Sequence, residues 1–180
     1  IVGLAKAYTT LHPNIVIILG DRFEMLAAAS AALLSRIPIA HIHGGEVTLG
    51  AYDDAIRHAI TKMASLHFVT HHDHAQRVIR MGEDPASVFV VGAPAIEGIS
   101  QLRLLSRDEI AAFVGFPVDR DAAIVTFHPV TMEKGGTQQH IRVLMRALHQ
   151  SGLRVIFTMP NADAEHRLIE RAIRSYVRLH

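Results

Sequence analysis

The stretch from Ile37 to Ile60 constrains the fold of this chain more than any other. Its first part, Ile37 to Ile42, is an apolar run with the length and β-branched content of a strand that is buried on both faces. The run ends in His41-Ile42-His43-Gly44-Gly45-Glu46, where paired glycines let the backbone turn sharply and let a ligand approach closely. Asp53-Asp54 then stands just ahead of an amphipathic helical run at 55–63. Two histidines, one glutamate and two aspartates are therefore gathered after a single buried strand.

Short apolar runs alternate with helical patterns on both sides of this stretch. We expect strands at 15–19, 37–42, 66–70, 88–91, 122–127 and 153–158, and helices at 1–10, 24–35, 54–64, 73–81, 96–105, 107–114, 137–149 and 164–179. This alternation implies βαβ units and parallel sheets. In open parallel sheets ligands lie outside the carboxyl ends of the strands, which is where the polar loop after Ile42 falls. The sequence therefore predicts an α/β fold with its chemistry at that edge.

The alternation comes in two series, separated by a looser region between about Pro94 and Asp121. We assign residues 1–95 to the first domain and 96–180 to a linker and a second domain. The first series begins inside a helix, and the second stops after two strands, which alone bury too little to be stable. We therefore expect an interior piece of a longer protein, with both domains incomplete: the C-terminal part of one and the first half of the other.

Composition excludes several classes of protein. The chain has 180 residues, 49% hydrophobic and 19% charged, which is typical of globular proteins. Its formal net charge of +1 does not favour a nucleic acid or an acidic membrane surface as partner. The absence of cysteine excludes a disulfide scaffold and a thiolate zinc site, and is compatible with the cytoplasm. No apolar run approaches the roughly 20 residues that span a bilayer.

Carboxylates follow two of the expected strands. Asp21, in Gly20-Asp21-Arg22, is either an acid or base beside an arginine for a phosphate, or part of a surface pair that caps the next helix. Glu46 and Asp53 can serve as paired carboxylates for proton transfer. Helix capping accounts for one of Asp53 and Asp54, but not for both together with Glu46.

The thirteen histidines need a separate assessment. His41 and His43, two apart on a strand, are expected to point the same way and suggest a metal site. The chain has no HExxH or comparable ligand spacing, so we expect no metal. Arg57 and His58 fall on the first turns of the next helix and can face the loop. His71-His72-Asp73-His74 is expected to be a solvated helix start.

In the second series, His128 follows a strand and suits a phosphate or a proton, while Asn161 follows the next strand and can both donate and accept. Asp163 is expected to cap a helix. Neither GxGxxG nor GxxxxGK[ST] occurs, so a dinucleotide fingerprint and a P-loop are not supported.

Five motifs together resemble the hydrolysing UDP-N-acetylglucosamine 2-epimerases. They are GDRFE at 20–24, HIHGGEVT at 41–48, DDAIRHAITKM at 53–63, FHPVT at 127–131 and PNAD at 160–163, in this order across nearly the whole chain. The resemblance implies two Rossmann-like domains of the glycosyltransferase-B kind with the nucleotide sugar between them. It also implies anti elimination of UDP to a 2-acetamidoglucal, followed by addition of water, with no cofactor.

The resemblance also implies roles for individual residues. Asp21 and Asp53 would be acid/base carboxylates, Arg22 and His128 would contact the diphosphate, and Asn161 would lie near the nucleotide. Many relatives have glutamate where this chain has His43, so either His43 or Glu46 takes that role here. The family uses a UDP-sugar, and we expect a homo-oligomer, dimer or tetramer, in the cytoplasm.

Several alternatives remain open at this point. The product is N-acetylmannosamine if the substrate is UDP-N-acetylglucosamine, but a UDP-2,4-diacetamido-trideoxy sugar of the legionaminic acid route is also compatible. A glycosyltransferase of the same architecture, a non-catalytic nucleotide-sugar binding domain and a histidine-based metal protein are the other candidates.

Overall fold

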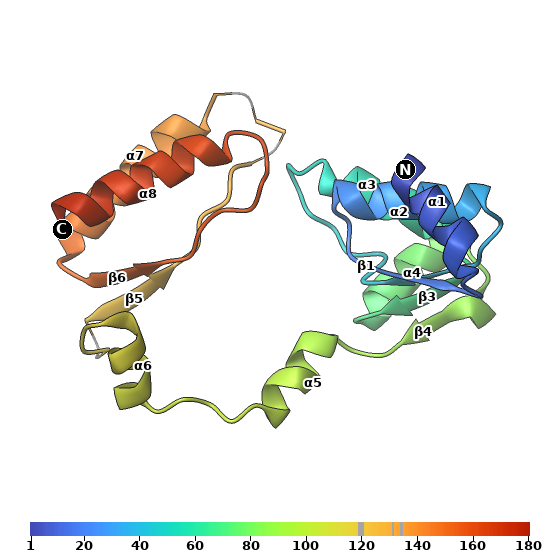
Figure 1. Ribbon diagram of the computed structural model, residues 1–180, viewed down its shortest axis with the longest axis horizontal. Coiled ribbons are helices and arrows are strands. Elements are labelled where there is room, and N and C mark those ends of the chain that lie inside the picture. The colour runs from blue at the N-terminus through green and yellow to red at the C-terminus, as the bar shows by residue number, and fades with distance from the viewer. Residues whose placement is uncertain (119–120, 131, 134) are drawn as a thin grey trace. The chain divides into compact units, whose positions relative to one another are not determined.

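The computed structural model describes residues 1–118, 121–130, 132–133 and 135–180. The chain divides into two compact units, Ile1–Leu102 and Arg103–His180 (Figure 1). Each unit is an α/β body with its own parallel sheet. The prediction of parallel strands alternating with helices is confirmed. The assignment of 1–95 and 96–180 to parts of two domains remains a prediction.

The first unit is built on a four-stranded sheet in the order β1-β2-β3-β4, and all three pairings are parallel. Its elements are α1 (Val2–Leu11), β1 (Val16–Leu19), α2 (Phe23–Leu34), β2 (Ile39–Ile42), α3 (Asp53–Met63), β3 (Leu66–Val69), α4 (His72–Arg80), a 3-10 turn (Pro85–Ser87), β4 (Val88–Val90) and α5 (Pro94–Gln101). Because the strands run the same way in sequence order, the loops after β1, β2 and β3 emerge side by side at one edge.

The core of this unit lies between the sheet and helices α2 and α3. Ile18, Ile39 and Ile60 are fully buried there, against Ala29 and Ala32 of α2. Alanine favours the helix and lets its backbone lie close to the strands. A smaller cluster of Val69, Ala75 and Val78 anchors α4 on the sheet. The helices before and after β2, and the helix after β3, thus pack against these strands and give the loops at their ends a rigid base.

The second unit has a two-stranded parallel sheet of β5 (Ala122–Val125) and β6 (Arg154–Phe157). Its helices are α6 (Arg107–Val114), α7 (Thr137–Ser151) and α8 (His166–Leu179), and Ile141, Ile169 and Ile173 form its core. A capping box formed by Ser106 and Glu109 begins α6. Within the described ranges, no helix of either unit is long and apolar enough to cross a membrane.

Element boundaries differ from the predicted ones by a few residues at most, in two cases for a clear local reason. Strand β2 begins at Ile39 and not at Ile37, because Pro38 has no N–H to donate to the ladder, although its carbonyl accepts from Val16 N at 2.9 Å. Helix α8 begins at His166 and not at 164, because Glu165 takes a left-handed conformation with φ 64°.

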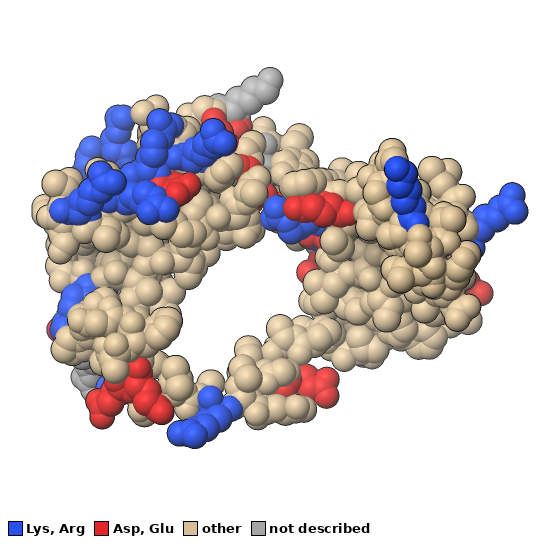
Figure 2. Space-filling model, in the orientation of Figure 1, with Lys and Arg blue, Asp and Glu red and all other residues tan. Residues whose placement is uncertain are grey.

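The small total charge conceals one strongly basic surface. Figure 2 shows lysine and arginine side chains gathered over α7 and α8. These two helices contain six exposed arginines, at positions 142, 146, 167, 171, 174 and 178, and one acidic residue, Glu170. The net charge of +1 therefore describes the whole chain but not this surface, and the expectation that neither a nucleic acid nor an acidic membrane surface is a partner does not follow from the total.

Candidate active site

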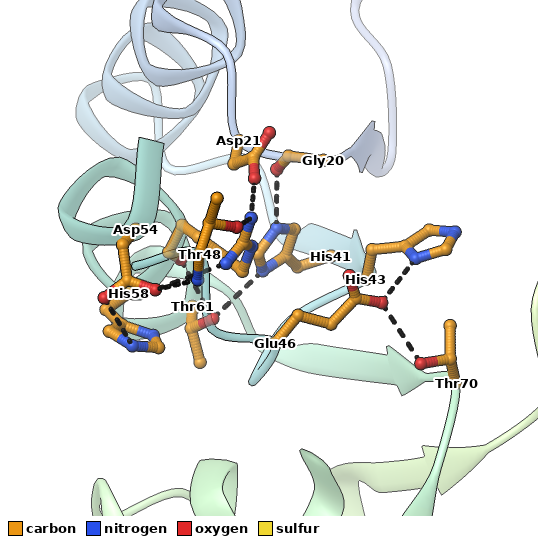
Figure 3. Close-up of polar contacts among 11 residues, drawn as sticks. Gly20, Asp21, His41, His43, Glu46, Thr48, Asp54, His58, Thr61 and Thr70 are labelled. Atoms are coloured by element: carbon orange, nitrogen blue, oxygen red, sulfur yellow. Dashed lines mark hydrogen bonds and ion pairs between the residues drawn. The ribbon is translucent and has the colours of Figure 1, made fainter. Parts of the chain in front are cut away.

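The candidate site lies at the carboxyl ends of β1, β2 and β3 (Figure 3). Asp21 follows β1, His43 and Glu46 follow β2, and Thr70 follows β3. Helix α3 brings Asp54 and Arg57 to the same edge, where Asp54, Arg57 and Asp21 join in one network. The parallel topology thus gathers polar side chains that lie up to half the length of the unit apart in sequence.

A buried arginine organises one half of the site. Arg57 is 4% exposed, and its guanidinium contacts the Asp21 carboxylate. It also donates to Thr48 Oγ1 at 2.9 Å and lies 3.4 Å from Asp54 Oδ1. Asp54 Oδ1 in turn accepts from the Thr48 backbone N–H at 2.9 Å. A buried cation is tolerated only when it is paired in this way, so Arg57 ties the ends of β1 and β2 to α3.

The residue that pairs with Asp21 is therefore Arg57, which lies 36 positions away, and not its neighbour Arg22. Arg22 stands at the N-cap of α2, 3.4 Å from Glu24, with its guanidinium 5.5 Å from the centre of the Phe23 ring. A surface pair between Asp21 and Arg22 is not among the contacts of the described residues. The role of Arg22 toward a diphosphate stays a prediction.

The capping alternative for Asp53 and Asp54 is wrong. The N-cap of α3 is Tyr52, with no side-chain capping bond, and both aspartates lie inside the first turn. Negative charge there is favoured by the helix dipole. Asp54 binds the loop before α3 instead of the helix end. Asp53 is the first residue of α3.

A second network surrounds Glu46. His43 Nδ1 lies 2.7 Å from Glu46 Oε1, and the Thr70 hydroxyl donates to the same oxygen at 3.1 Å. His74 Nδ1 lies 2.7 Å from the Thr70 hydroxyl oxygen. Burial by itself raises the pKa of Glu46, but the hydrogen bonds from His43 and Thr70 and the nearby histidines outweigh it and lower the pKa below its ordinary value. Glu46 is therefore held as a carboxylate.

His41 and His43 do not act as a pair. Strand β2 ends at Ile42, and His43 takes a left-handed φ of 68°, so the alternation of the strand does not extend to it. His41 is fully buried: its Nε2–H donates to the Gly20 carbonyl at 2.9 Å, and its Nδ1 lies 3.1 Å from the Thr61 hydroxyl. The expectation that both point the same way is wrong. Among the residues that the structure describes, no group of three or more possible ligands could hold a metal ion.

The protonation of His41 follows from its partners. A carbonyl only accepts, so Nε2 carries a hydrogen, while Nδ1 lies 3.1 Å from the Thr61 hydroxyl, which itself donates to the Arg57 carbonyl at 3.0 Å. Burial lowers the pKa of His41 to about 4, opposed by the Gly20 carbonyl and reinforced by His67 and Arg57. His41 is thus a neutral structural group that fixes the backbone just before Asp21.

Two residues of the Glu46 network were not identified from the sequence. Thr70 directly follows the third strand, and that position alone is the signal that could have found it. His74 was expected to be part of a solvated helix start. The expectation holds for His71 and His72, which are exposed, but His74 is half-buried and bonded to Thr70.

The second unit places its candidate residues after its two parallel strands. His128 follows β5 and Asn161 follows β6, and both side chains are exposed. The Thr126 and Thr158 hydroxyls bond at 2.7 Å where these loops begin. Thr131, the last residue of the FHPVT motif, lies outside the described residues. Asp163 is buried, and its carbonyl accepts from the His166 backbone and lies 2.7 Å from His166 Nδ1, while Glu165 takes the N-cap position.

A family model described as UDP-N-acetylglucosamine 2-epimerase matches residues 1–180. The chain belongs to this family. The GDP/UDP-N,N'-diacetylbacillosamine 2-epimerase (hydrolyzing) of Campylobacter jejuni is 39% identical to it over 97% of this chain and 46% of that protein. The UDP-N,N'-diacetylbacillosamine 2-epimerase (hydrolyzing) of Legionella pneumophila is 37% identical over 98% of this chain and 47% of that protein. The chain thus spans about half the length of the relatives it matches.

The fold of the family is also shared. The S. aureus MnaA-UDP co-structure superimposes with a TM-score of 0.74 at 18% identity, over 99% of this chain and 48% of that one. The predicted fold class, α/β with two Rossmann-like, glycosyltransferase-B-like parallel-sheet domains, is confirmed, and so is the family resemblance drawn from the motifs.

Replacing Gly45 with alanine should destabilise the first unit. Gly45 has φ 78°, and a Cβ there would be driven into the His74 backbone carbonyl and the Val78 side chain. We expect a loss of at least about 2 kcal/mol from the left-handed backbone and the clash together. Hydrogen exchange of α3 and α4 peptides measures it. The control G3A lies in α1 with open space around its Cβ and should stabilise by about 0.5 to 1 kcal/mol. Equal exchange in G45A and the parent would contradict the packing of this loop.

Unfolding stability should fall as the pH drops from 6.5 toward 4. The lowered pKa of His41 means that in this window the unfolded chain binds a proton that the folded chain does not. One such histidine takes about 2 kcal/mol of stability between pH 7 and pH 5. In H41Q this part of the pH dependence should vanish, whatever the absolute stability. Urea denaturation at several pH values tests it, with H72Q, at an exposed histidine of α4, as the control that keeps the parent slope.

Proposed function

We propose that the protein is a hydrolysing 2-epimerase that acts on UDP-linked 2-acetamido sugars. The observation that carries this proposal is the edge of the first sheet, where Asp21, held by a buried arginine, stands with the Glu46 network in a chain matched throughout by the 2-epimerase family model. Proton transfer at carbon needs groups of this kind, held in place and sheltered from water.

The proposed reaction has two steps. In the first, a base removes the C2 proton, the C2–H electron pair forms a C1=C2 double bond, and the C1–O bond breaks with its electrons leaving on UDP. In the second, water adds its oxygen to C1 while C2 takes a proton on the opposite face, which gives the free 2-epimer. Both faces of C2 therefore need a proton-transfer group.

We assign the proton transfers to groups of the first unit, drawn from Asp21, Asp53, His43 and Glu46. In the second unit, the exposed His128 and Asn161 follow parallel strands and are available to a ligand, so we assign them to the diphosphate and the nucleotide. We also assign Arg22, at the N-cap of α2, to the diphosphate, because its charge and the helix dipole would both favour an anion. Departure of UDP requires such donors where negative charge grows, and no cofactor takes part in either step.

The two relatives favour one substrate over the other. Both are named for N,N'-diacetylbacillosamine, whereas the family model is described for UDP-N-acetylglucosamine. We therefore propose a UDP-2,4-diacetamido-trideoxy sugar as the preferred substrate and UDP-N-acetylglucosamine as the second candidate. The C. jejuni relative is also named for GDP, so the nucleotide belongs in the same comparison.

Product analysis in deuterated water tests the reaction and the substrate together. The protein expressed from its full reading frame should release the nucleoside diphosphate and a free 2-epimer with one deuterium at C2, because the proton returned to C2 comes from solvent. We expect the diacetamido sugar to exceed N-acetylglucosamine by at least about tenfold in kcat/KM. A glycosyltransferase would form no 2-epimer without an acceptor, and a binding protein would leave every nucleotide sugar intact.

The Asp21 carboxylate should be essential to turnover. D21N keeps the shape of the side chain and an oxygen for Arg57 but removes the charge, so we expect kcat to fall by at least about 100-fold with the circular dichroism spectrum unchanged. The control D108N makes the same chemical change at an exposed aspartate in the first turn of α6 and should stay within about twofold of the parent. Parent-like turnover in D21N would remove Asp21 from the mechanism.

A further inference from the structure

The imidazole of His43 is held from one side only. Nδ1 is bonded to Glu46, and Nε2 has no partner among the residues that the structure describes. The side chain is 24% exposed, and Figure 3 shows its second nitrogen directed away from Glu46. A neutral imidazole whose Nδ1–H donates to a carboxylate carries its lone pair on Nε2, where it can accept a proton.

Glu46 is better suited to orient than to carry a proton. One of its oxygens receives both His43 and Thr70. These bonds lower the pKa of Glu46 in spite of its partial burial, so it remains ionised and accepts only. It therefore selects the His43 tautomer that leaves Nε2 available, and stabilises the imidazolium that forms after proton uptake.

Thr70 and His74 hold Glu46 from behind. The Thr70 hydroxyl has a single hydrogen, which goes to Glu46 because an ionised carboxylate cannot donate. His74 Nδ1, 2.7 Å from the Thr70 oxygen, must then be the donor to it. His74 thus donates to Thr70 and Thr70 donates to Glu46, and both hydrogen bonds stabilise the negative charge on Glu46.

The backbone of His43 is strained in a way that places this ring. Its φ of 68° is uncommon outside glycine and is best tolerated by Asn, Asp and His. Strain of this kind concentrates at functional sites. Here the left-handed backbone turns the imidazole of His43 away from the direction of the His41 side chain and places it beyond the end of β2 (Figure 3).

Asp21 differs from this arrangement in one decisive respect. Its carboxylate is already engaged by the buried guanidinium of Arg57. The lone pair on His43 Nε2 has no such partner among the described residues.

We propose that His43 Nε2 is the base that takes the C2 proton as UDP leaves, and that Glu46, fixed by Thr70 and His74, is its positioning residue. The inference rests on the function proposed above. The proton moves from C2 to Nε2, the C2–H electrons form the C1=C2 bond, and the C1–O electrons leave with UDP. Asp21 and Asp53 are then left for the return of a proton to the other face.

The first test separates the two chemical steps in the full-length protein. H43N keeps a residue that tolerates the left-handed backbone and can donate to Glu46. We expect UDP release from the nucleotide sugar to slow by about 100- to 10,000-fold, and hydration of supplied 2-acetamidoglucal with UDP to change by less than about tenfold. The control H72N makes the same chemical change at an exposed histidine of α4 and should match the parent.

The second test asks whether Glu46 acts through His43. E46Q removes the negative charge that stabilises the imidazolium formed after proton uptake, so UDP release should slow while hydration of supplied 2-acetamidoglucal stays within about tenfold of the parent. T70V should slow UDP release in the same way but by less. H43E supplies a carboxylate that needs no orienting partner. E46Q should therefore cost about tenfold or more when made in the parent, and less than about threefold when made in the H43E variant.

These outcomes separate failure of the inference from failure of the proposed function. If the parent releases neither nucleoside diphosphate nor deuterated 2-epimer, the proposed function falls. If the parent does so while H43N keeps UDP release, His43 is not the base. If E46Q slows both chemical steps equally, or slows UDP release by the same factor in the H43E variant as in the parent, Glu46 has only a structural role.

Discussion

The site depends first on the guanidinium of Arg57, which is almost completely withdrawn from water. A buried cation without partners would destabilise the fold by about 3 to 5 kcal/mol, so its neighbours are obligatory. These neighbours come from the loop after β1, the loop after β2 and the preceding turn of α3. One side chain thus joins three separate segments, and the backbone N–H of Thr48 closes the ring through Asp54.

His41 completes the same joint without charge. It bonds the Gly20 carbonyl on one side and the Thr61 hydroxyl on the other, so it links the end of β1 to α3 beneath Arg57. Because burial keeps the imidazole neutral near pH 7, with its pKa lowered to about 4, His41 adds no second cation beside the guanidinium. A hydrogen bond from His41 therefore fixes the Gly20 carbonyl, and an ion pair with Arg57 fixes the Asp21 carboxylate next to it.

The two carboxylates of the site consequently have different environments. Asp21 faces a fixed positive charge, whereas Glu46 accepts hydrogen bonds from an imidazole and a hydroxyl. The charge of Asp21 is paired with the guanidinium of Arg57. The charge of Glu46 instead orients His43, whose other ring nitrogen has no partner among the described residues. Such a division of neighbouring acidic groups by their surroundings is how one site can hold acid and base roles together.

Much of this could be predicted from sequence, because it depends on local pattern. Every expected strand and helix is present, within a few residues, since apolar period and turn residues act over short distances. The collection of Asp21, His43 and Glu46 at one edge also followed, because parallel strands place their carboxyl ends together. The family was identified from the five sequence motifs.

The chain by itself therefore determined the α/β class, the edge at which the polar residues meet, and the family. Only the tertiary structure decided which of them touch. Arg22 is next to Asp21 in sequence, yet it stands at the N-cap of α2 beside Glu24, while α3 brings Arg57 from 36 residues away. His41 and His43 share a strand pattern in the sequence. In the structure β2 ends at Ile42 and His43 takes a left-handed conformation, so His41 lies in the core while His43 is partly exposed. Thr70 and His74 join Glu46 only because β3 lies beside β2, and which side chains meet across neighbouring strands follows from packing and not from their order along the chain.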